Sequence, residues 1–490
     1  MIQALAERGH TVVLAAERQR NRPVWLPKNL ALVNRALRAR ALPGRIEVTA
    51  CPVRRVDKWR DLVPPLRQAR DYLRFLDPRY ADKGKLERRS AMHAPPGWPQ
   101  FVRDRLSISR HWKRLSRALA LVEDATPTEK FFDLFIQYEQ PDVVLVTPLV
   151  DYGSYQTDYV KSAHRIGVPV VFVPFSWDNL TNRGLVRVEP DRVLVWNDIQ
   201  KQEAVELHGV RSDRVIVTGA PRFDAFFAMQ PSTSREAFCA RVGLDPGSPF
   251  ILYVCSSEFV APREVEFVKR WAKRMRASDD PIVRKCGVLV RPHPVHTKQW
   301  KDVKASELTN AVIWAEKETM NADQGLYDSL HHAAACVGLN TSAMIEAGIL
   351  GKPVLTLVSE EFAGGQEETV HFHYLRAANG GLLIEARSAG EHIQQLGDVL
   401  RGSDSGTQAR RFTERFVRPR GLERRVTPIM VEQIERAASI AKQPQGASAW
   451  HYPVRGAVLA LFALRRLARR RRAGVRPAAQ VTQATRDGRE

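Results

Sequence analysis

The chain has 490 residues, of which 44% are apolar and 26% are charged, and its formal net charge is +21. These proportions are typical of a folded globular protein and exclude a disordered chain or a polytopic membrane protein. Because a single hydrophobic core rarely grows beyond about 250–300 residues, we expect at least two domains.

Most of the positive charge comes from two segments, residues 36–117 and residues 441–490, which contribute +13 and +9. The body between them has no zinc-finger, RRM or KH signature, so we expect no nucleic-acid partner. Segments this basic suit an anionic membrane surface or a phosphorylated acceptor. A solvated basic face without any partner is the alternative interpretation.

The five cysteines are scattered, and no two have the spacing of a zinc site or a redox pair. The N-terminus lacks the pattern of a signal peptide, and no apolar run approaches the ~20 residues that a membrane-spanning helix needs. We therefore predict a cytoplasmic protein that can attach peripherally to the inner membrane. No Asp-x-Asp motif stands where a divalent cation would be expected, so we predict no metal site.

The chain begins with a helical pattern that ends at Gly9 and leads into an apolar strand at residues 11–16. A Rossmann-like domain normally opens with a strand and a glycine-containing loop, so we expect that first strand to be missing here. Residues 36–117 then predict a mostly helical basic insertion, broken at Pro64 and Pro65 and again around residues 95–97. Its aromatic side chains suit a membrane interface or sugar stacking, although packing between helices also explains them.

Short apolar runs then alternate with polar helical segments, which is the pattern of buried parallel strands in an α/β domain. The expected strands of the first half are residues 142–147, 169–173, 192–196 and 215–219, with helices at 155–165 and 199–208. Those of the second half are residues 250–254, 287–290, 311–314, 335–338 and 353–357. The sequence therefore predicts an α/β fold of two Rossmann-like domains.

We place the N-terminal domain at residues 1–219, an interdomain linker at 220–247, the C-terminal domain at 248–405, closing helices at 406–440 and a basic tail at 441–490. Within the tail, residues 454–472 join an apolar block to a run of arginines and are too short to span a bilayer. They predict a basic amphipathic helix in the lipid headgroup region, with a flexible tail or a partner-docking helix as alternatives. Beyond Ala473 we expect disorder.

The most informative local pattern is residues 336–355, where a strand ends, Asn340, Thr341 and Ser342 can cap a helix, and that helix continues past Glu346. A helix N-terminus at the carboxyl edge of a sheet binds phosphate well, because its free N–H groups point at the ligand. Glu346, one turn into the helix, could reach ribose hydroxyls. An ordinary capped helix is the alternative.

Two further loops follow predicted strands and could contact the same ligand. Ser256 and Ser257 come directly after the strand at 250–254 and offer hydroxyl and backbone donors to a diphosphate. Gly365 and Gln366 come after the strand at 353–357, where glycine permits a close backbone approach. His371 and His373 follow in that loop as donor or acceptor contacts.

The segment at residues 175–184 is unusually rich in polar side chains for a loop between a strand and a helix. Asp178 is a candidate general base for an acceptor hydroxyl, with Asn179 and Asn182 positioning the acceptor. A structural role, in which these side chains only form Asx turns, is equally consistent with the sequence.

The pattern of strand, small polar turn, helix with Glu346, then Gly351-Lys352-Pro353 resembles the donor-binding half of the GT-B superfamily. The relatives it suggests are nucleotide-sugar glycosyltransferases, UDP-N-acetylglucosamine 2-epimerases and CDP-glycerol glycerophosphotransferases. Arg291 and His293, in Arg-Pro-His-Pro, are similar to the Arg-x-His-Pro segment of the last group, and residues 176–184 resemble one of its loops. The resemblance covers about residues 142–411.

This resemblance implies two domains facing across a cleft, an acceptor side at the N-terminus and a nucleotide donor held by the C-terminal domain. It implies that Arg291 and His293 face the donor phosphates and that helix dipoles and basic side chains, rather than a metal, stabilise the leaving diphosphate. We expect the donor to be a substrate, UDP- or CDP-linked, with no separate cofactor.

The expected activity is transfer of a sugar or a polyol phosphate from that donor to a lipid-linked or polysaccharide acceptor at the cytoplasmic membrane face. A nucleotide-sugar epimerase is the first alternative, since it would share the fold and the donor site. A GT-B protein that binds polysaccharide or membrane without turnover is the second.

Overall fold

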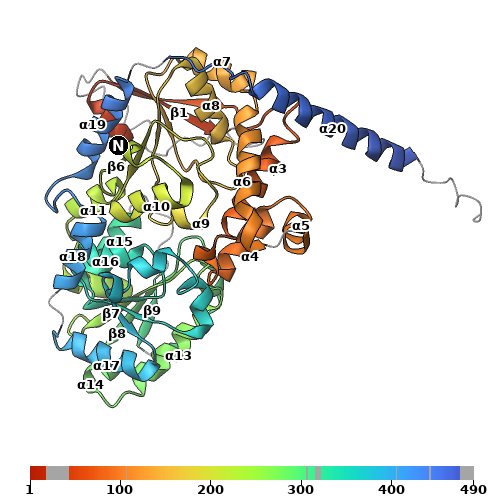
Figure 1. The fold of residues 1–490 in the computed structure, drawn as a ribbon. Helices are drawn as coiled ribbons and strands as arrows, with labels where there is room; N and C mark the ends of the chain where they lie inside the picture. Colours follow the sequence, from red (N-terminus) through yellow and green to blue (C-terminus); the bar gives the residue numbers. More distant parts are fainter. Residues whose placement is uncertain are drawn as a thin grey trace, which may run out of the picture.

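The computed structural model describes residues 1–17, 44–105, 108–304, 307–308, 310–314, 322–403, 406–440 and 443–474. Two α/β lobes lie one above the other, a group of helices lies along one side of them, and one long helix projects from the molecule (Figure 1). The expectation of disorder beyond Ala473 concerns residues 475–490, which lie outside the described residues.

The C-terminal lobe is built on a six-stranded parallel sheet in the order β12-β11-β10-β7-β8-β9. Its strands are β7 (Phe250–Val254), β8 (Gly287–Arg291), β9 (Ala311–Ile313), β10 (Ala335–Gly338), β11 (Val354–Leu357) and β12 (Leu383–Ala386). Every residue of β7 and β10 is buried, as continuous apolar runs covered by helices on both faces require. The strand order is that of a Rossmann fold, and it reverses direction between β7 and β10.

The N-terminal lobe contains a four-stranded parallel sheet in the order β3-β4-β5-β6. Its strands are β3 (Val144–Val146), β4 (Val170–Phe172), β5 (Arg192–Val195) and β6 (Val215–Val217), with helices α7 (Lys130–Glu139), α8 (Gln156–Ile166), α9 (Asn179–Asn182) and α10 (Asp198–His208). After the helix α1 (Ile2–Glu7), β1 (Thr11–Glu17) pairs in parallel with β2 (Arg45–Cys51) in a separate two-stranded sheet. The predicted α/β class of two Rossmann-like domains is confirmed.

The C-terminal sheet is covered by helices that sequence periodicity indicated, and two hydrophobic clusters fill the spaces on its two faces. These helices are α13 (Glu264–Arg276), α14 (Pro281–Lys285), α15 (Ala322–His332), α16 (Ala343–Ile349) and α17 (Ala389–Leu400), with short 3-10 turns at Lys298–Trp300, Glu360–Gly365, His371–Tyr374 and Ala377–Asn379. The 3-10 turn η6 (Glu360–Gly365) contacts helix α4 (Gly84–His93) of the basic insertion.

Among the described residues of the basic insertion, 44–105 and 108–117, the first helix begins at Val63. Its elements are α3 (Val63–Arg74), η1 (Pro78–Tyr80), α4 (Gly84–His93), α5 (Trp98–Arg105) and α6 (Ile108–Ala125). The expectation of helix across its first part is wrong at Arg45–Cys51, because these residues form β2 and pair along their full length with β1. Strand pairing with a distant segment overrides local helical preference there.

The segment between the two sheets is packed rather than extended. It forms η3 (Pro221–Phe223), α11 (Asp224–Ala228) and α12 (Arg235–Val242), and Phe223, Phe226 and Phe238 belong to the main hydrophobic cluster. After α18 (Thr407–Phe416), the chain returns to the N-terminal lobe, where α19 (Val426–Ala438) packs on β4 and β5. The chain therefore connects the lobes twice.

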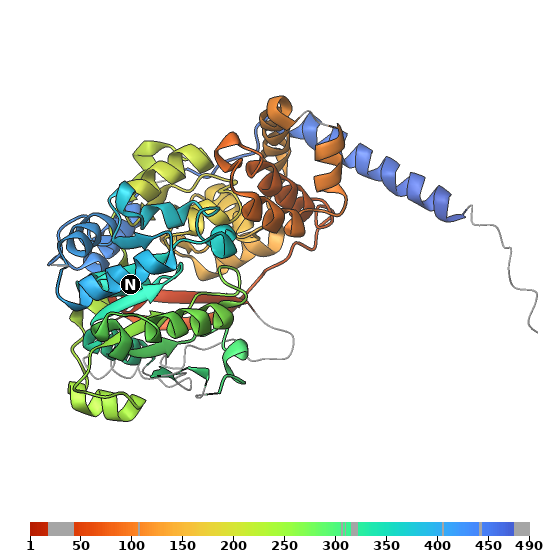
Figure 2. The ribbon, with the colours of Figure 1, turned by 90° about the horizontal axis from the view of Figure 1, so that it is seen from below.

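The basic tail forms the helix α20 (His451–Gly474). Its first turns lie on α6, where His451 is 3.2 Å from Asp124 and the Arg455 Nε donates to the Ala125 carbonyl at 2.5 Å. The rest of α20 extends away from the body in both views (Figures 1 and 2). Among the helices the structure describes, none combines the length and the apolar character that crossing a membrane requires.

Candidate functional site

The candidate site lies where the loops after β7 and β10 meet, at the reversal of strand order in the C-terminal sheet. In open α/β sheets, ligands bind in the crevice at this position. The Asn340 N–H, after β10, donates to the Ser256 hydroxyl, after β7, at 3.4 Å. The Cys255 N–H donates to the Arg291 carbonyl at 3.0 Å, so the end of β8 joins the same group.

Asn340 is the centre of the buried part of this site. Its amide nitrogen lies 2.7 Å from the Gly365 carbonyl, 3.4 Å from the Thr369 hydroxyl and 3.3 Å from the His371 Nε2. Its amide oxygen is buried without a hydrogen-bond partner among the described residues, and so is the His371 Nδ1. Since buried polar atoms are normally paired, both atoms are candidates for a ligand contact.

Asp178 approaches this group from the N-terminal lobe, on the loop that follows β4. The Asn182 amide nitrogen donates to the Asp178 Oδ2 at 2.8 Å, which fixes the carboxylate over the first turn of α9. The Asn179 oxygen accepts from the backbone N–H groups of Phe175 and Ser176. Asn179 therefore shapes the loop, and Asn182 orients Asp178.

Asp178 and His371 come from different lobes and lie close enough to shift each other's pKa. The Trp177 ring meets the His371 ring edge-on, with centroids 4.9 Å apart. Burial raises the pKa of Asp178, but the neighbouring His371 and hydrogen bonds with Ser176 and Asn182 outweigh it and lower the pKa below its usual range. Burial lowers the pKa of His371, with Asp178 opposing this only in part. At neutral pH the site thus contains an ionised carboxylate beside a neutral imidazole.

A second carboxyl group, that of Glu203 on α10, lies near this pair. Burial raises the pKa of Glu203 to about 8, with Tyr374 and Arg74 opposing the shift and Asp178 adding to it. Neither Glu203 oxygen makes a hydrogen bond of ordinary geometry, although the Tyr374 hydroxyl is close enough to affect its pKa. Neighbouring carboxyl groups with opposite pKa shifts are the arrangement used for acid and base roles in one site.

Glu346 forms a separate part of the site with two basic side chains. The Arg222 guanidinium donates to the Glu346 Oε1 at 3.3 Å, and Arg222 is 43% exposed. Burial raises the pKa of Glu346 to about 7, and the nearby charges of Arg222 and Arg291 oppose that shift. Arg291 itself donates to the Ser329 hydroxyl at 2.9 Å.

His293 lies two residues beyond β8 and is partly buried. Its Nδ1 accepts from the Val295 N–H at 3.4 Å, while its carbonyl accepts from the His296 N–H at 2.8 Å. Burial, followed by the neighbouring His296, lowers the pKa of His293. The ring is therefore neutral at pH 7 and can act as a hydrogen-bond donor or acceptor.

Two of the predicted contact residues, Gln366 and Gly365, make close contacts within the protein. The Gln366 amide nitrogen donates to the Leu339 and Leu357 carbonyls at 3.2 and 3.1 Å, so Gln366 joins the ends of β10 and β11. A Cβ at Gly365 would lie 2.3 Å from the Val260 carbonyl oxygen, so this glycine serves protein packing rather than ligand approach. The Ser257 and Thr341 carbonyls accept turn hydrogen bonds from Val260 and Met344, and these bonds do not involve the hydroxyl groups that were predicted to contact the ligand.

The expected side-chain cap of α16 is wrong. Ser342 stands at the cap position, but its own backbone is already helical and its side chain makes no capping hydrogen bond. The extended backbone that lets a cap hydroxyl reach the following N–H groups is missing. Because α16 has only seven residues, we do not base a phosphate site on its dipole.

The basic insertion contacts the loop between β11 and β12, which carries His371. The Lys83 ammonium donates to the Glu367 carbonyl at 2.6 Å and lies 3.2 Å from the His373 Nε2. The Lys85 N–H donates to the Glu368 carboxylate at 3.0 Å. Helix α4 is thus bound to the loop that carries His371 and His373, and His373 serves this contact.

Sequence reasoning missed Trp177, Glu203 and Tyr374, and it named His371 only as a general contact. Trp177 stands in the loop already singled out, so its position beside Asp178 was a usable signal. Glu203 offers none, because a glutamate in the polar helix α10 has the pattern of an exposed side chain. Its neighbour Tyr374, which affects its pKa, lies 171 positions later in the chain.

Among the residues that the structure describes, no three or more His, Cys, Asp or Glu side chains are grouped as they would be to hold a metal ion. A surface hollow lined by Phe267, Trp271 and Ile393 lies on α13 and α17. It contains none of the polar residues above, and we do not place the site there.

No family model and no curated protein matches the chain. Among solved structures, it is similar to the UDP-GlcNAc 2-epimerase from Methanocaldococcus jannaschii in complex with UDP-GlcNAc and UDP, at 13% identity and a TM-score of 0.43, covering 87% of this chain and 99% of that one. It is similar to the Neisseria meningitidis enzyme bound to UDP-GlcNAc at 16% identity and a TM-score of 0.42, covering 66% and 82%.

A third similar structure is the wall teichoic acid polymerase TagF, at 12% identity and a TM-score of 0.35, covering 51% of this chain and 58% of that one. These proteins are of the kinds that the sequence motifs resemble. All three TM-scores are below 0.5, so these likenesses carry no argument, and the roles of individual residues are argued from their own contacts.

Proposed function

We propose that this protein is a transferase that moves a sugar or a polyol phosphate from a nucleotide-activated donor to a lipid-linked or polysaccharide acceptor. The observation that carries the proposal is the meeting of Asp178, from the N-terminal lobe, with His371 and Asn340, from the C-terminal lobe. Asp178 and Asn340 follow the carboxyl ends of β4 and β10, and His371 lies in the segment between β11 and β12. Asn340 and His371 have buried atoms without partners among the described residues.

In the proposed reaction, the ionised Asp178 removes the proton of an acceptor hydroxyl. The acceptor oxygen then forms a bond to the reacting carbon or phosphorus of the donor, and the bond from that atom to the nucleotide phosphate breaks. The neutral His371 and the Asn340 amide hold the reacting groups between the lobes. The low pKa of Asp178 keeps it ionised before each turnover.

We assign the donor to the C-terminal lobe. Arg291 and His293 would contact its phosphates, and Arg291 supplies the positive charge that stabilises a leaving diphosphate. Glu346 would accept hydrogen bonds from the ribose, with Arg222 beside it. Ser256 is held by Asn340, so both loops would move together on binding.

We assign the basic surfaces to the membrane face. The two positive segments that are far apart in the sequence meet where α20 lies on α6 (Figure 1). A basic helix that projects from this surface can lie among anionic headgroups and bring a lipid-linked acceptor close to the protein.

A nucleotide-sugar epimerase is the second candidate function. The observation that favours it is the protonated Glu203 near the ionised Asp178, since an epimerase needs one group to remove a proton and another to return one. A membrane-facing helix has no part in that reaction.

A thermal-shift screen with UDP, GDP, CDP, CMP and their sugar and polyol conjugates tests the proposal, because a ligand that binds only the folded state raises its melting temperature. We expect one nucleotide family to give a shift, and Glu346→Gln to remove it. The matched control is Glu414→Gln, an exposed residue on α18. A folded sample that no nucleotide stabilises would instead favour a binding protein without turnover.

Transfer of label from the stabilising conjugate to a lipid-linked acceptor separates the two enzymatic candidates. The transferase predicts labelled acceptor. The epimerase predicts a changed sugar on the same nucleotide, with no acceptor required.

A further inference from the structure

Helix α7 carries apolar side chains on its exposed side as well as on its buried side. Six of its ten residues are large and apolar. Phe132 and Ile136 are buried in the core of the N-terminal lobe, whereas Phe131, Leu134 and Tyr138 are 54%, 58% and 84% exposed. A surface helix normally keeps its apolar residues on the side that faces the core, so the exposed three need another explanation.

The three exposed side chains form one continuous row, which we call the α7 stripe. They are spaced three and four residues apart, and this spacing places them on the same face of a helix. The opposite side of α7 packs on α8, where the Phe132 and Tyr159 rings meet edge-on with centroids 4.8 Å apart. The α7 stripe therefore points away from the core.

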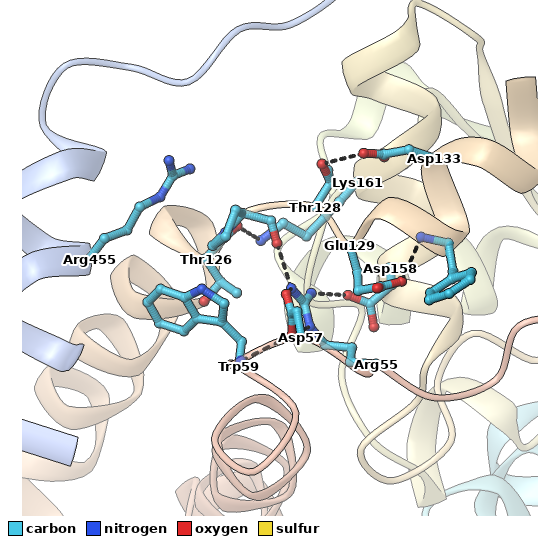
Figure 3. A network of polar contacts seen from close by, with 12 residues as sticks. Arg55, Asp57, Trp59, Thr126, Thr128, Glu129, Asp133, Asp158, Lys161 and Arg455 are labelled. Atoms are coloured by element: carbon cyan, nitrogen blue, oxygen red, sulfur yellow. Dashed lines mark hydrogen bonds and ion pairs between the residues drawn. The ribbon is translucent and has the colours of Figure 1, made fainter. Parts of the chain in front are cut away.

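The turn that leads into α7 is fixed by polar contacts (Figure 3). The Lys161 ammonium, on α8, donates to the Thr126 carbonyl at 2.6 Å. The Glu129 carboxylate accepts from the Phe131 N–H at 2.9 Å and caps the first turn of the helix. The α7 stripe is thus held on a well-anchored helix, and its exposure is a property of the folded lobe.

The basic tail passes close to this helix. The Gln445 N–H donates to the His164 carbonyl, in the last turn of α8, at 3.1 Å. Further along the tail, His451 lies 3.2 Å from Asp124, at the end of α6. Since α7 packs on α8 and follows α6 after a short turn, the tail runs from one neighbour of α7 to the other.

Exposed apolar and basic side chains are concentrated in this part of the N-terminal lobe. Among the described residues, fourteen large apolar side chains are exposed, and eight of these lie on α6, on α7 or in residues 450–464. Helix α6 adds the exposed Lys113, Arg114 and Arg117, and residues 441–490 contribute a net charge of +9. Exposed apolar patches mark interaction surfaces, and aromatic residues beside basic ones suit the lipid headgroup region.

We propose that the α7 stripe inserts into the surface of an anionic bilayer while the basic tail lies on the headgroups. The inference rests on the membrane attachment in the proposed function and adds the element that enters the lipid. Charge decides the occupant of the stripe. A second copy of this chain would bring like-charged segments together, whereas an anionic lipid surface is complementary to them.

Sedimentation of the full-length protein with vesicles of phosphatidylcholine and phosphatidylglycerol, at low and at high salt, tests the insertion. Salt screens the attraction of the basic segments but does not weaken the burial of apolar side chains. We therefore expect wild type to keep part of its vesicle binding at high salt. Leu134→Glu should weaken that remaining binding at least about tenfold, because a leucine side chain no longer enters the lipid.

The matched control is Ile282→Glu, which makes the same change in charge at an apolar side chain that is 36% exposed. Ile282 lies on α14, at the opposite end of the molecule from α7 (Figure 1), and this variant should bind vesicles as wild type does. Tyr138→Ser alters a side chain with little packing in the core and should weaken binding at high salt at least about threefold. Urea unfolding of each variant checks that it is folded.

The inference is overturned if Leu134→Glu and Tyr138→Ser bind vesicles as Ile282→Glu does, and attachment by the tail would then stand without α7. Wild type that sediments with no vesicles at either salt concentration would overturn the membrane attachment itself, and the insertion with it. Sedimentation velocity tests the other occupant. A wild-type dimer that Leu134→Glu dissociates, with vesicle binding unchanged, would make the α7 stripe a contact between copies of the chain.

Discussion

Two buried polar regions of this molecule differ in how completely their groups are paired. Around Arg67, all four oxygens of Glu123 and Asp158 accept hydrogen bonds from guanidinium groups. Between the lobes, Asn340, His371 and Glu203 each keep buried atoms without a partner. Complete pairing holds an insertion onto a sheet, and incomplete pairing marks a region where a ligand can supply the missing contacts.

The largest expected effect is on turnover, from the region with incomplete pairing. Asp178→Asn should lower turnover by about 10²–10⁴-fold, since a general base contributes that much and an amide cannot accept the proton. Its effect on the free energy of unfolding should stay near 1 kcal/mol, as for one altered hydrogen bond. Activity assays and urea titrations measure the two. Equal losses in activity and stability would show a structural role.

The next effect is on stability, from the fully paired region. Asp158→Asn should reduce the free energy of unfolding by about 3–5 kcal/mol, because Arg55 and Arg67 both lose a buried counter-ion. Urea unfolding of wild type and variant gives this difference. Asp198→Asn, on the first turn of α10 and exposed, is the control. A loss below about 1 kcal/mol would mean that the paired region is no more stabilising than a surface ion pair.

The third prediction concerns how the free energy of unfolding changes with pH, which depends on Glu203 in the incompletely paired region. The pKa of Glu203 is about 8 in the folded protein, above its ordinary value of 4.5. Between these values the unfolded chain has lost the proton that the folded chain retains, so stability falls as the pH rises.

Glu203→Gln should therefore change little at pH 4 and should stabilise the protein by about 2–4 kcal/mol at pH 8, as measured by urea unfolding at both pH values. Glu206→Gln, one turn along the same helix and 50% exposed, should leave the pH profile as it is. If both variants changed the pH dependence of stability in the same way, Glu203 would be excluded as the protonated partner of Asp178.

The smallest expected effect on stability is that of removing the tail. A chain that ends at Gln445 lacks α20 and should unfold within about 0.5 kcal/mol of wild type, because the polar contacts of α20 with α6 are one ion pair to the exposed Asp124 and one hydrogen bond to the Ala125 carbonyl. Sedimentation with anionic vesicles should nevertheless fall strongly. Undiminished sedimentation would place the membrane surface on the insertion instead.

Much of the fold follows from the sequence because buried parallel strands are continuous apolar runs. The strands at 250–254 and 335–338 agree with the structure at both ends. The strand Leu383–Ala386 was missed because it lies at the sheet edge and includes Glu385, which breaks the apolar run. The strand Arg45–Cys51 was missed because its pairing with β1 crosses a long stretch of chain.

The candidate site was predictable in part for the same reason. Polar residues that follow apolar strands collect at one sheet edge, and this placed Asp178, Ser256, Asn340 and Arg291 near the functional region. The sequence did not show that the Gln366 amide is used up by the Leu339 and Leu357 carbonyls, or that Ser342 makes no cap. These outcomes depend on backbone positions set by neighbouring loops.

The sequence by itself determined the fold class, most of the strand positions and the two basic segments, because these depend on local hydrophobic patterns and on composition. Only the tertiary structure decided that Asp178 lies near His371, that Glu203 is buried near Tyr374, and that Arg67 is paired with two carboxylates. The physical reason is that burial and pairing depend on which distant segments meet, and the pKa of a side chain and its hydrogen bonds follow from that meeting.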